Sequence, residues 1–407
     1  MYVCMGITLL SLPGKVYSKV LERRVRPIVE PRIEEEQCGF RPGRGTTDLL
    51  FTLYRIMEGA WEYAHPVYMC FVDSEKANDR VPREKLWEVL REYGVRGSLL
   101  GAIQSLYAQS ESCVRVLGSK SKAFPVGVGL RQGCALSPIL FVVFMDRISR
   151  RSWGEEGLQF GGLRISTLLF SDDVFLKASS VCDLQLSLER FAVECEAVRM
   201  RISTSKSEAM VLSRKPMDCL LQVGNVSLPQ VKEFKKEFGV LFTSEGKRGE
   251  FGRRIGAAGA VLHSLYRTVV TKRELSRKAK LSIYRSIFVP TLTYVHKGWV
   301  MTERTRSRVQ VAEMGFLRRV AGVSLRDRVR SSAIREELGV EPLLLCVERS
   351  QLRWFGHLVR MPPGRLPREV FQARPAGKRP LEDPGLGGEI ISLHWPGNAL
   401  GSPSQSW

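Results

Sequence analysis

Residues 164–178 read Arg-Ile-Ser-Thr-Leu-Leu-Phe-Ser-Asp-Asp-Val-Phe-Leu-Lys-Ala, two apolar runs that meet at Asp172 and Asp173. Short apolar runs on either side of a polar pair predict two strands joined by a tight turn. A third run, 67–72, is apolar and stops at Asp73, as a buried strand does. If these strands are neighbours in one sheet, Asp73 and Asp172 converge at its edge.

The remaining periodicity surrounds these strands with helices. We expect a further strand at 208–212, a hairpin over 113–128, and a helix at 139–148 for which Ser137 supplies a cap and Pro138 the first turn. Helical patterns also cover 15–29, 46–63, 83–93, 98–109 and 183–198. This order predicts an α+β fold with an antiparallel sheet and helices on one side of it.

The charge is distributed unevenly along the 407 residues. The chain carries 62 Lys and Arg against 42 Asp and Glu, a formal charge of +20. Residues 1–246 hold 33 basic and 29 acidic side chains, whereas 247–379 hold 29 basic and 10 acidic ones. A near-neutral body joined to a strongly basic region suggests a polyanionic partner. Aromatic residues are interleaved with these basic side chains, and they either pack between helices or stack on bases.

Several classes of protein are excluded by composition. No run approaches the roughly 18 apolar residues of a membrane span, so we expect no membrane partner. Nine scattered cysteines without a Cys-x-x-Cys pair, and five histidines without ligand spacing, argue against a disulfide framework and a zinc site. They favour a reducing, intracellular location, nuclear or cytoplasmic. Residues 380–407 are rich in Pro and Gly, which predicts a disordered tail.

The three aspartates allow two interpretations. Two unit charges about 4 Å apart repel by roughly 4 kcal/mol at an effective dielectric of 20, so converging carboxylates need a cation. Mg²⁺ takes carboxylate oxygens together with substrate phosphates, and a pair of such ions serves polymerase-type transfer. On spacing alone, Asp172-Asp173 could equally be a plain hairpin turn, and Asp73 a plain strand end.

Five segments in one collinear order resemble motifs of the reverse transcriptases of non-LTR (LINE-type) retrotransposons. They read Gln-Cys-Gly-Phe-Arg-Pro-Gly-Arg-Gly-Thr-Thr-Asp at 37–48 (fingers), Phe-Val-Asp-Ser-Glu-Lys-Ala-Asn-Asp at 71–79 (motif A), Leu-Arg-Gln-Gly-Cys-Ala-Leu-Ser-Pro at 130–138 (motif B), Phe-Ser-Asp-Asp at 170–173 (motif C) and Ile-Ser-Thr-Ser-Lys-Ser at 202–207 (motif D).

The resemblance implies a right-hand polymerase. Fingers and palm would occupy 1–250, and a basic, mostly helical thumb-like region 251–379. The basic stretch at 353–362 resembles the family's region downstream of the polymerase. Residues 6–11 resemble sequence within the fingers, so we expect a truncated chain that begins inside the family's longer reading frame, without its upstream endonuclease domain.

By the same resemblance, the chain is an RNA-directed DNA polymerase that uses an RNA template, a DNA primer and dNTPs. Asp73 and Asp172 would be the metal ligands, with Asp173 beside them as a third catalytic carboxylate, for two Mg²⁺ ions that Mn²⁺ can replace. The residues implied to contact nucleotide or template are Arg41, Arg44, Asn78, Gln132, Gly133 and Lys206.

Two departures from the family pattern bear on activity. The family carries an aromatic residue where Asn78 stands, and that ring excludes a ribose 2′-hydroxyl. The primer-grip segment at 234–239 has one extra residue and two charges where apolar side chains are usual. A one-residue shift turns the side chains of a strand to its opposite face. These departures keep a second hypothesis open, an inactive remnant that binds RNA or DNA through its basic half. A basic scaffold unrelated to polymerases would require the five motifs to be coincidental.

Overall fold

The computed structural model describes residues 9–234, 239–244, 250–270, 272, 274–299, 301–375 and 377. They divide into two compact units. The first contains the described residues up to Phe234 together with 362–375, and the second those from 239 to Met361 together with Gly377. The chain thus returns to the first unit after completing the second. The predicted tail, 380–407, lies outside the described residues.

A four-stranded antiparallel sheet forms the centre of the first unit, with the strands in the order β10-β1-β9-β8. The strands are β1 (Val67–Val72), β8 (Thr167–Phe170), β9 (Asp173–Ala178) and β10 (Glu208–Leu212). The two runs predicted at 67–72 and 208–212 have these bounds in the structure. The α+β fold with an antiparallel sheet is confirmed.

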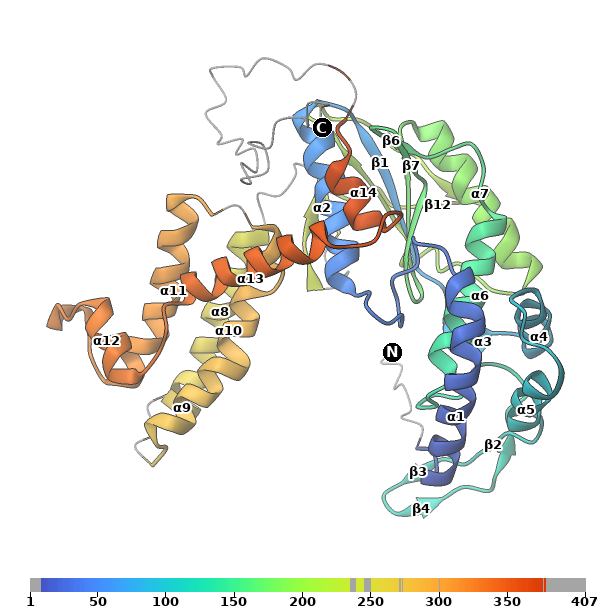
Figure 1. The fold of residues 1–407 in the computed structure, drawn as a ribbon, viewed down its shortest axis with the longest axis horizontal. Coiled ribbons are helices and arrows are strands. Elements are labelled where there is room, and N and C mark those ends of the chain that lie inside the picture. Colours follow the sequence, from blue (N-terminus) through green and yellow to red (C-terminus); the bar gives the residue numbers. More distant parts are fainter. Residues whose placement is uncertain are drawn as a thin grey trace, which may run out of the picture. The chain divides into compact units, whose positions relative to one another are not determined.

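Helices cover both faces of this sheet, so the expectation of helices on one side is wrong. Tyr68, Cys70 and Val72 of β1 pack into a core shared with α6 (Ser137–Arg151) and α7 (Val181–Ala197). On the opposite face α2 (Thr46–Glu62) contacts β8 and β10 (Figure 1). All six residues of β1 are buried, and a strand that is apolar on both faces requires a cover on each.

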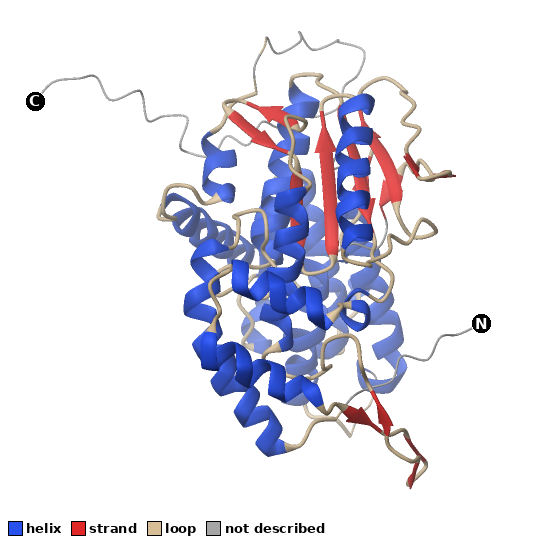
Figure 2. Ribbon diagram, turned by 90° about the vertical axis from the view of Figure 1, so that its right-hand side faces the viewer, coloured by secondary structure: helices blue, strands red, loops and turns tan. Residues whose placement is uncertain are grey.

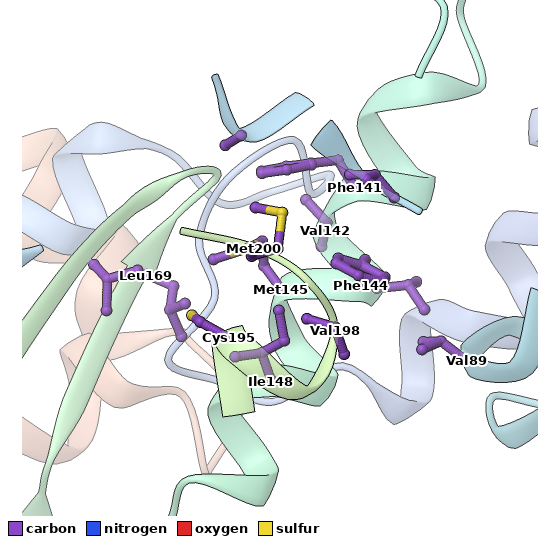
Figure 3. Close-up of a cluster of buried hydrophobic side chains, with 14 of the residues drawn as sticks. Val89, Phe141, Val142, Phe144, Met145, Ile148, Leu169, Cys195, Val198 and Met200 are labelled. Carbon is purple, nitrogen blue, oxygen red and sulfur yellow. The ribbon is translucent and has the colours of Figure 1, made fainter. Parts of the chain in front are cut away.

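Helix α6 is largely buried in this core. Its residues Ile139–Met145 are fully buried, and Figure 3 shows Phe144, Met145 and Ile148 lying against Cys195 and Val198 at the end of α7. Pro138 lies in the first turn of α6 as predicted, but Ser137 does not cap the helix. Its hydroxyl instead donates to the carbonyl of Arg131 at 2.7 Å, which ties the helix to the preceding loop.

The other elements of the first unit surround the sheet, and Figure 2 shows the small hairpins of β2–β5 standing apart from it. These elements are α1 (Leu12–Val29), η1 (Glu30–Arg32), α3 (Ala77–Arg80), α4 (Arg83–Glu92), α5 (Gly97–Ala108), β2 (Glu111–Ser112), β3 (Arg115–Val116), β4 (Ser119–Lys120), β5 (Phe124–Pro125), β6 (Leu158–Phe160), β7 (Leu163–Ile165), β11 (Gln222–Val223), β12 (Val226–Ser227), β13 (Glu233–Phe234) and α14 (Leu366–Gln372).

The second unit is helical and contains a buried cluster of three aromatic rings. Tyr284, Phe288 and Phe316 lie within 5.0–5.7 Å of one another, centroid to centroid, and all three are buried. Trp299 and Trp354 are buried as well, so packing accounts for most of the aromatic residues of this region. Its elements are β14 (Phe242–Thr243), α8 (Glu250–Leu265), η3 (Tyr266–Val270), α9 (Arg277–Ile283), η4 (Tyr284–Phe288), α10 (Val289–Thr293), η5 (His296–Gly298), α11 (Glu303–Ala321), η6 (Leu325–Asp327), α12 (Ser331–Leu338) and α13 (Leu343–Val359).

Two further properties of the described residues bear on the class of protein. None of their helices combines the length and apolar character that crossing a membrane requires. The eight cysteines that the structure describes are all free thiols, five of them buried.

Candidate active site

Three aspartates, Asp73, Asp172 and Asp173, lie at one end of the central sheet. β1 pairs with β9 in a register that ends with Val72 opposite Val174, and one more step places Asp73 opposite Asp173. Phe170 pairs with Asp173 across the β8–β9 hairpin, so Ser171 and Asp172 form its two-residue turn. Ser171 has a positive φ of 63°, which non-glycine residues adopt mainly in tight turns. The adjacency of the two strands therefore brings Asp73 and the Asp172 turn together.

Two hydrogen bonds hold the backbone of Asp73 and so place its carboxylate. Its N–H donates to Ser207 Oγ at 3.1 Å, and its carbonyl accepts from the N–H of Ser203 at 2.8 Å. Burial raises the pKa of this carboxyl, and the charge of Asp172 raises it further, while Lys206 acts in the opposite direction. The segment 203–207 thus holds the Asp73 backbone, and the environment of the side chain disfavours a bare negative charge.

One oxygen of Asp73 lacks a hydrogen-bond partner. Oδ1 is buried and accepts no hydrogen bond, and the Lys206 ammonium is 3.7 Å from it. A buried carboxylate oxygen without a donor is costly unless a cation compensates it. Asp172 beside it is exposed. No group of three or more His, Cys, Asp or Glu side chains poised for a metal occurs among the described residues. Two carboxylates suit Mg²⁺, which retains water and takes substrate oxygens.

Asn78 lies beside the loop that carries Gln132 and Gly133. Its carbonyl accepts from the N–H of Leu130 at 2.9 Å. Gly129 has a φ of 79°, and a Cβ there would lie 2.4 Å from the carbonyl oxygen of Asp79. Only glycine permits this close approach of the loop to α3. The predicted pocket residues therefore lie on two neighbouring segments of the chain. All three of them are exposed to solvent: Asn78, Gln132 and Gly133.

We expected Arg41 to contact phosphate, but its side chain is buried and bonded inside the first unit. Its side chain is 2% exposed. Its five N–H groups donate to the carboxylate and carbonyl of Glu30 and to the carbonyls of Ile33, Glu34 and Gln37. A guanidinium has only five such donors, so none is left for a ligand. The physical role of Arg41 in the structure is to hold the 30–37 segment.

Arg44 is also paired inside the first unit. It forms a bidentate ion pair with Glu35, with 2.6 Å between Nη2 and Oε1, and its side chain is 11% exposed. Arg365, just before α14, reaches the same place from the far end of the chain and pairs with Asp48 at 3.2 Å. Asp48 also accepts from the Gly45 N–H, as expected for a residue at the start of α2. The sequence offered no signal for the Arg365 contact.

Lys177 is a buried cation that the sequence analysis missed. It lies on β9, it is fully buried, and its Nζ has no hydrogen-bond partner. Burial lowers its pKa to about 7, while the nearby Glu36 and Cys38 act in the opposite direction. Its one visible signal was a lysine inside an otherwise apolar strand, four residues after Asp173.

The chain is similar to known proteins over much of its length. The model of the family described as "Reverse transcriptase (RNA-dependent DNA polymerase)" matches residues 4–238. The retrovirus-related Pol polyprotein of the type-2 retrotransposable element R2DM, from Drosophila melanogaster, is 25% identical over 67% of this chain and 27% of its own length. An uncharacterized 149 kDa protein of transposon TX1, from Xenopus laevis, is 28% identical over 53% of this chain and 17% of its own. The RNA-directed DNA polymerase from mobile element jockey, from Drosophila funebris, is 25% identical over 79% of this chain and 36% of its own.

The chain covers only part of the length of each relative. The chain spans about a quarter of the R2DM polyprotein and about a third of the jockey polymerase.

Proposed function

The chain belongs to the reverse transcriptase family, and we propose that it is an RNA-directed DNA polymerase that extends a DNA primer on an RNA template with dNTPs. The observation that carries the proposal is the buried Oδ1 of Asp73, which accepts no hydrogen bond and lies near Asp172 at the end of two paired strands. The reaction is attack of the primer 3′-hydroxyl on the α-phosphate of a dNTP, with pyrophosphate leaving.

The residues present fit a divalent cation. Asp73 and Asp172 would hold Mg²⁺, or Mn²⁺ in its place, with Asp173 as the adjacent carboxylate. When two such ions are bound, they make the 3′-hydroxyl a better nucleophile and neutralise the charge that develops on the leaving group. Ser203 and Ser207 fix the backbone of Asp73, so the carboxylate is oriented before substrate arrives.

Lys206 is placed to act on the nucleotide. Its side chain is 67% exposed, and its only ion pair in the described part of the chain is the 3.7 Å contact with Asp73. A cation bound at Asp73 would compete with that contact, and the ammonium would then be available for the phosphates and for protonation of the leaving pyrophosphate. Gln132 and Gly133 would border the template and the incoming base. Arg44 could reach a phosphate only by leaving Glu35.

Primer extension tests the proposal directly. We expect the purified chain, given an annealed RNA template and DNA primer, dNTPs and Mg²⁺, to lengthen the primer, and EDTA to stop it. A chain that binds the duplex and never extends the primer, with Mg²⁺ or with Mn²⁺, would contradict catalysis and support the inactive remnant.

Asn78 leads to a prediction about sugar selection. Because a short, exposed side chain stands where the family has an aromatic ring, we expect weak discrimination against rNTPs. Asn78→Phe should raise the preference for dNTP over rNTP by at least about tenfold, since a steric block costs a competing substrate more than about 1.4 kcal/mol. The measurement is kcat/KM for dGTP and GTP on one template. Asn78→Ala, which adds no bulk, is the control, and an equal preference in all three chains would contradict this role.

The second unit is proposed as a thumb that grips the template–primer duplex. Arg353 and Arg360 lie on one exposed side of α13 and its end, and neither forms an ion pair in the described part of the chain. Arg349, on the same helix, is instead paired with Glu341 at 2.5 Å. Unpaired guanidinium groups on a helix suit phosphate contact.

This proposal predicts steep salt dependence. If about six phosphates are neutralised, log K should fall by roughly 0.7–0.9 per contact for each tenfold rise in salt concentration. Affinity for the duplex should then fall about a thousandfold between 50 and 200 mM salt. The double variant Arg353→Gln/Arg360→Gln should reduce the slope by about two contacts. Arg349→Gln is the matched control, because Glu341 already neutralises that residue. Fluorescence anisotropy with a labelled duplex gives both slopes, and a flat dependence would contradict the grip.

The inactive remnant remains the second candidate, and Asn78 is the residue that favours it. The altered primer-grip segment bears on the same question, but residues 235–238 lie outside the described residues. Restoring an aromatic at 78 and deleting one residue between 235 and 238 separates the two candidates. If only the repaired chain extends primers, the native chain is a nucleic-acid-binding remnant.

A further inference from the structure

A short segment of the fingers motif extends the central sheet next to the candidate metal site. The N–H of Cys38 donates to the carbonyl of Leu169 on β8, and the N–H of Leu169 donates to the carbonyl of Glu36, both at 2.9 Å. Gln37 lies opposite Leu169 in a parallel bridge. Residues 36–38 are therefore attached to β8 just before the turn that carries Asp172.

The Gln37 side chain reaches that turn. It is fully buried, and its Oε1 accepts two backbone hydrogen bonds, from Gly39 at 2.8 Å and from Ser171 at 3.2 Å. Ser171 is the residue with positive φ immediately before Asp172. A non-glycine residue in this conformation costs of order 1–3 kcal/mol and persists only where its surroundings hold it. The Gln37 amide is one of the groups that hold it.

Gly39 packs against the same peptide. A Cβ at this position would lie 2.3 Å from the nitrogen of Ser171 and 3.0 Å from its Cα. Both are backbone atoms, so relief would require the turn itself to move. The fingers segment thus contacts the turn in two ways, by a buried hydrogen bond and by a backbone approach that only glycine allows.

We infer that Gln37 and Gly39 are positioning residues that set the place of the Asp172 carboxylate relative to Asp73. The inference rests on the proposed function, because it assigns these residues to the metal site of that reaction. The carboxylates come from strands far apart in sequence, and a 1 Å displacement of one of them changes a metal site and its reaction substantially. Groups that orient ligands typically contribute 10–100-fold to metal affinity or activity.

Two substitutions at Gln37 separate the hydrogen bond from side-chain bulk. Gln37→Met keeps the length of the side chain and removes the acceptor, whereas Gln37→Glu keeps an oxygen that can accept from both N–H groups. Gly39→Ala tests the close approach, and Gly101→Ala is its matched control, because a Cβ at Gly101 meets nothing within 4 Å.

The primary measurement is Mn²⁺ binding to the full chain by electron paramagnetic resonance, with no substrate present. We expect Gln37→Met and Gly39→Ala to weaken Mn²⁺ binding about tenfold or more, and Gln37→Glu and Gly101→Ala to stay within about threefold of the native chain. In primer extension Gln37→Met and Gly39→Ala should lower kcat and leave the Kd for the duplex unchanged, because the Asp172 carboxylate that they displace lies at the reacting centre.

Each outcome decides one question. If the native chain binds Mn²⁺ no better than Asp172→Asn does, the metal site of the proposed function fails. If the native chain binds Mn²⁺ and Gln37→Met and Gly39→Ala bind it equally well, the positioning role is wrong while the proposed function stands. Thermal melting identifies a variant that has unfolded. If Gly39→Ala unfolds, the Gln37→Met and Gln37→Glu pair decides alone, and equal binding by that pair overturns the inference.

Discussion

Primer extension by the Asp172→Asn variant is expected to fall by at least about a thousandfold, and the same loss is expected for Asp73→Asn. A thousandfold corresponds to about 4 kcal/mol of transition-state stabilisation. Asn keeps the shape of each side chain but removes the negative charge through which the carboxylate would hold a divalent cation. Asp73 follows β1 and Asp172 precedes the neighbouring strand β9, and the two carboxyls are close enough for the charge of Asp172 to raise the pKa of Asp73. If they hold one cation, loss of either leaves the other without its partner.

The control for this pair is Asp218→Asn. Asp218 is exposed and makes no side-chain contact that the structure records, so the same chemical change there should leave extension unchanged. Folding is followed by thermal melting. Burial and the charge of Asp172 both raise the pKa of Asp73, so neutralising this residue should leave the melting temperature unchanged or higher. Equal primer extension by Asp172→Asn and the native chain would remove Asp172 from the mechanism.

The second large effect is expected on the free energy of unfolding when Lys177 is replaced by methionine. Lys177 is fully buried without a hydrogen-bond partner, and its pKa is lowered to about 7 from the ordinary value of 10.5. The unfolded chain binds this proton more tightly than the folded one, so folding is penalised at neutral pH and the penalty shrinks as pH rises. By linkage the penalty at pH 7 is on the order of 4 kcal/mol. Replacement by methionine removes it and fills similar space.

We therefore expect Lys177→Met to raise the free energy of unfolding at pH 7 by about 2 kcal/mol or more. Part of the gain is offset because Glu36 loses a neighbouring cation. Between pH 7 and 8.5 the native chain should become more stable by on the order of 2 kcal/mol, and the variant should not. The window stops there because burial raises the pKa of Cys38 to about 12, which destabilises the fold once unfolded thiols ionise.

Urea unfolding at the two pH values measures both effects. Lys215→Met is the control, since Lys215 is exposed and its side chain has no recorded partner. If Lys177→Met is less stable than the native chain at pH 7, the ammonium contributes favourably to the fold and the assignment of a burial penalty is wrong.

Local pattern was a good guide to the strands and to the aspartates that follow them. The apolar runs 67–72 and 208–212 are strands with those bounds, and Asp172-Asp173 lies at the β8–β9 turn. Burial on both faces makes such strands apolar throughout, which is visible in the sequence. The same pattern could not show that α2 covers the second face, because periodicity identifies an apolar helix face and not the surface it packs against.

Charge and residue type were poorer guides to the partners of side chains. Arg41 and Arg44 lie in a Gly/Pro-rich loop that suggests solvent and phosphate, yet both guanidinium groups are paired inside the first unit. Ser137 has the residue type and position of a cap, but its hydroxyl serves the loop before the helix. Each of these outcomes depends on which acceptor lies within about 3 Å, and that distance is a property of the packed chain.

The sequence by itself determined the antiparallel strands, the family motifs and the three aspartates at strand ends, because apolar runs and polar stops are local features with a local physical cause. Only the tertiary structure decided what surrounds those aspartates. The bond from Gln37 to Ser171 spans 134 residues, as does that from Ser207 to Asp73, and the contact of Arg365 with Asp48 spans 317. Such contacts leave no period in the sequence, since they depend on the mutual placement of separate strands and loops that packing creates.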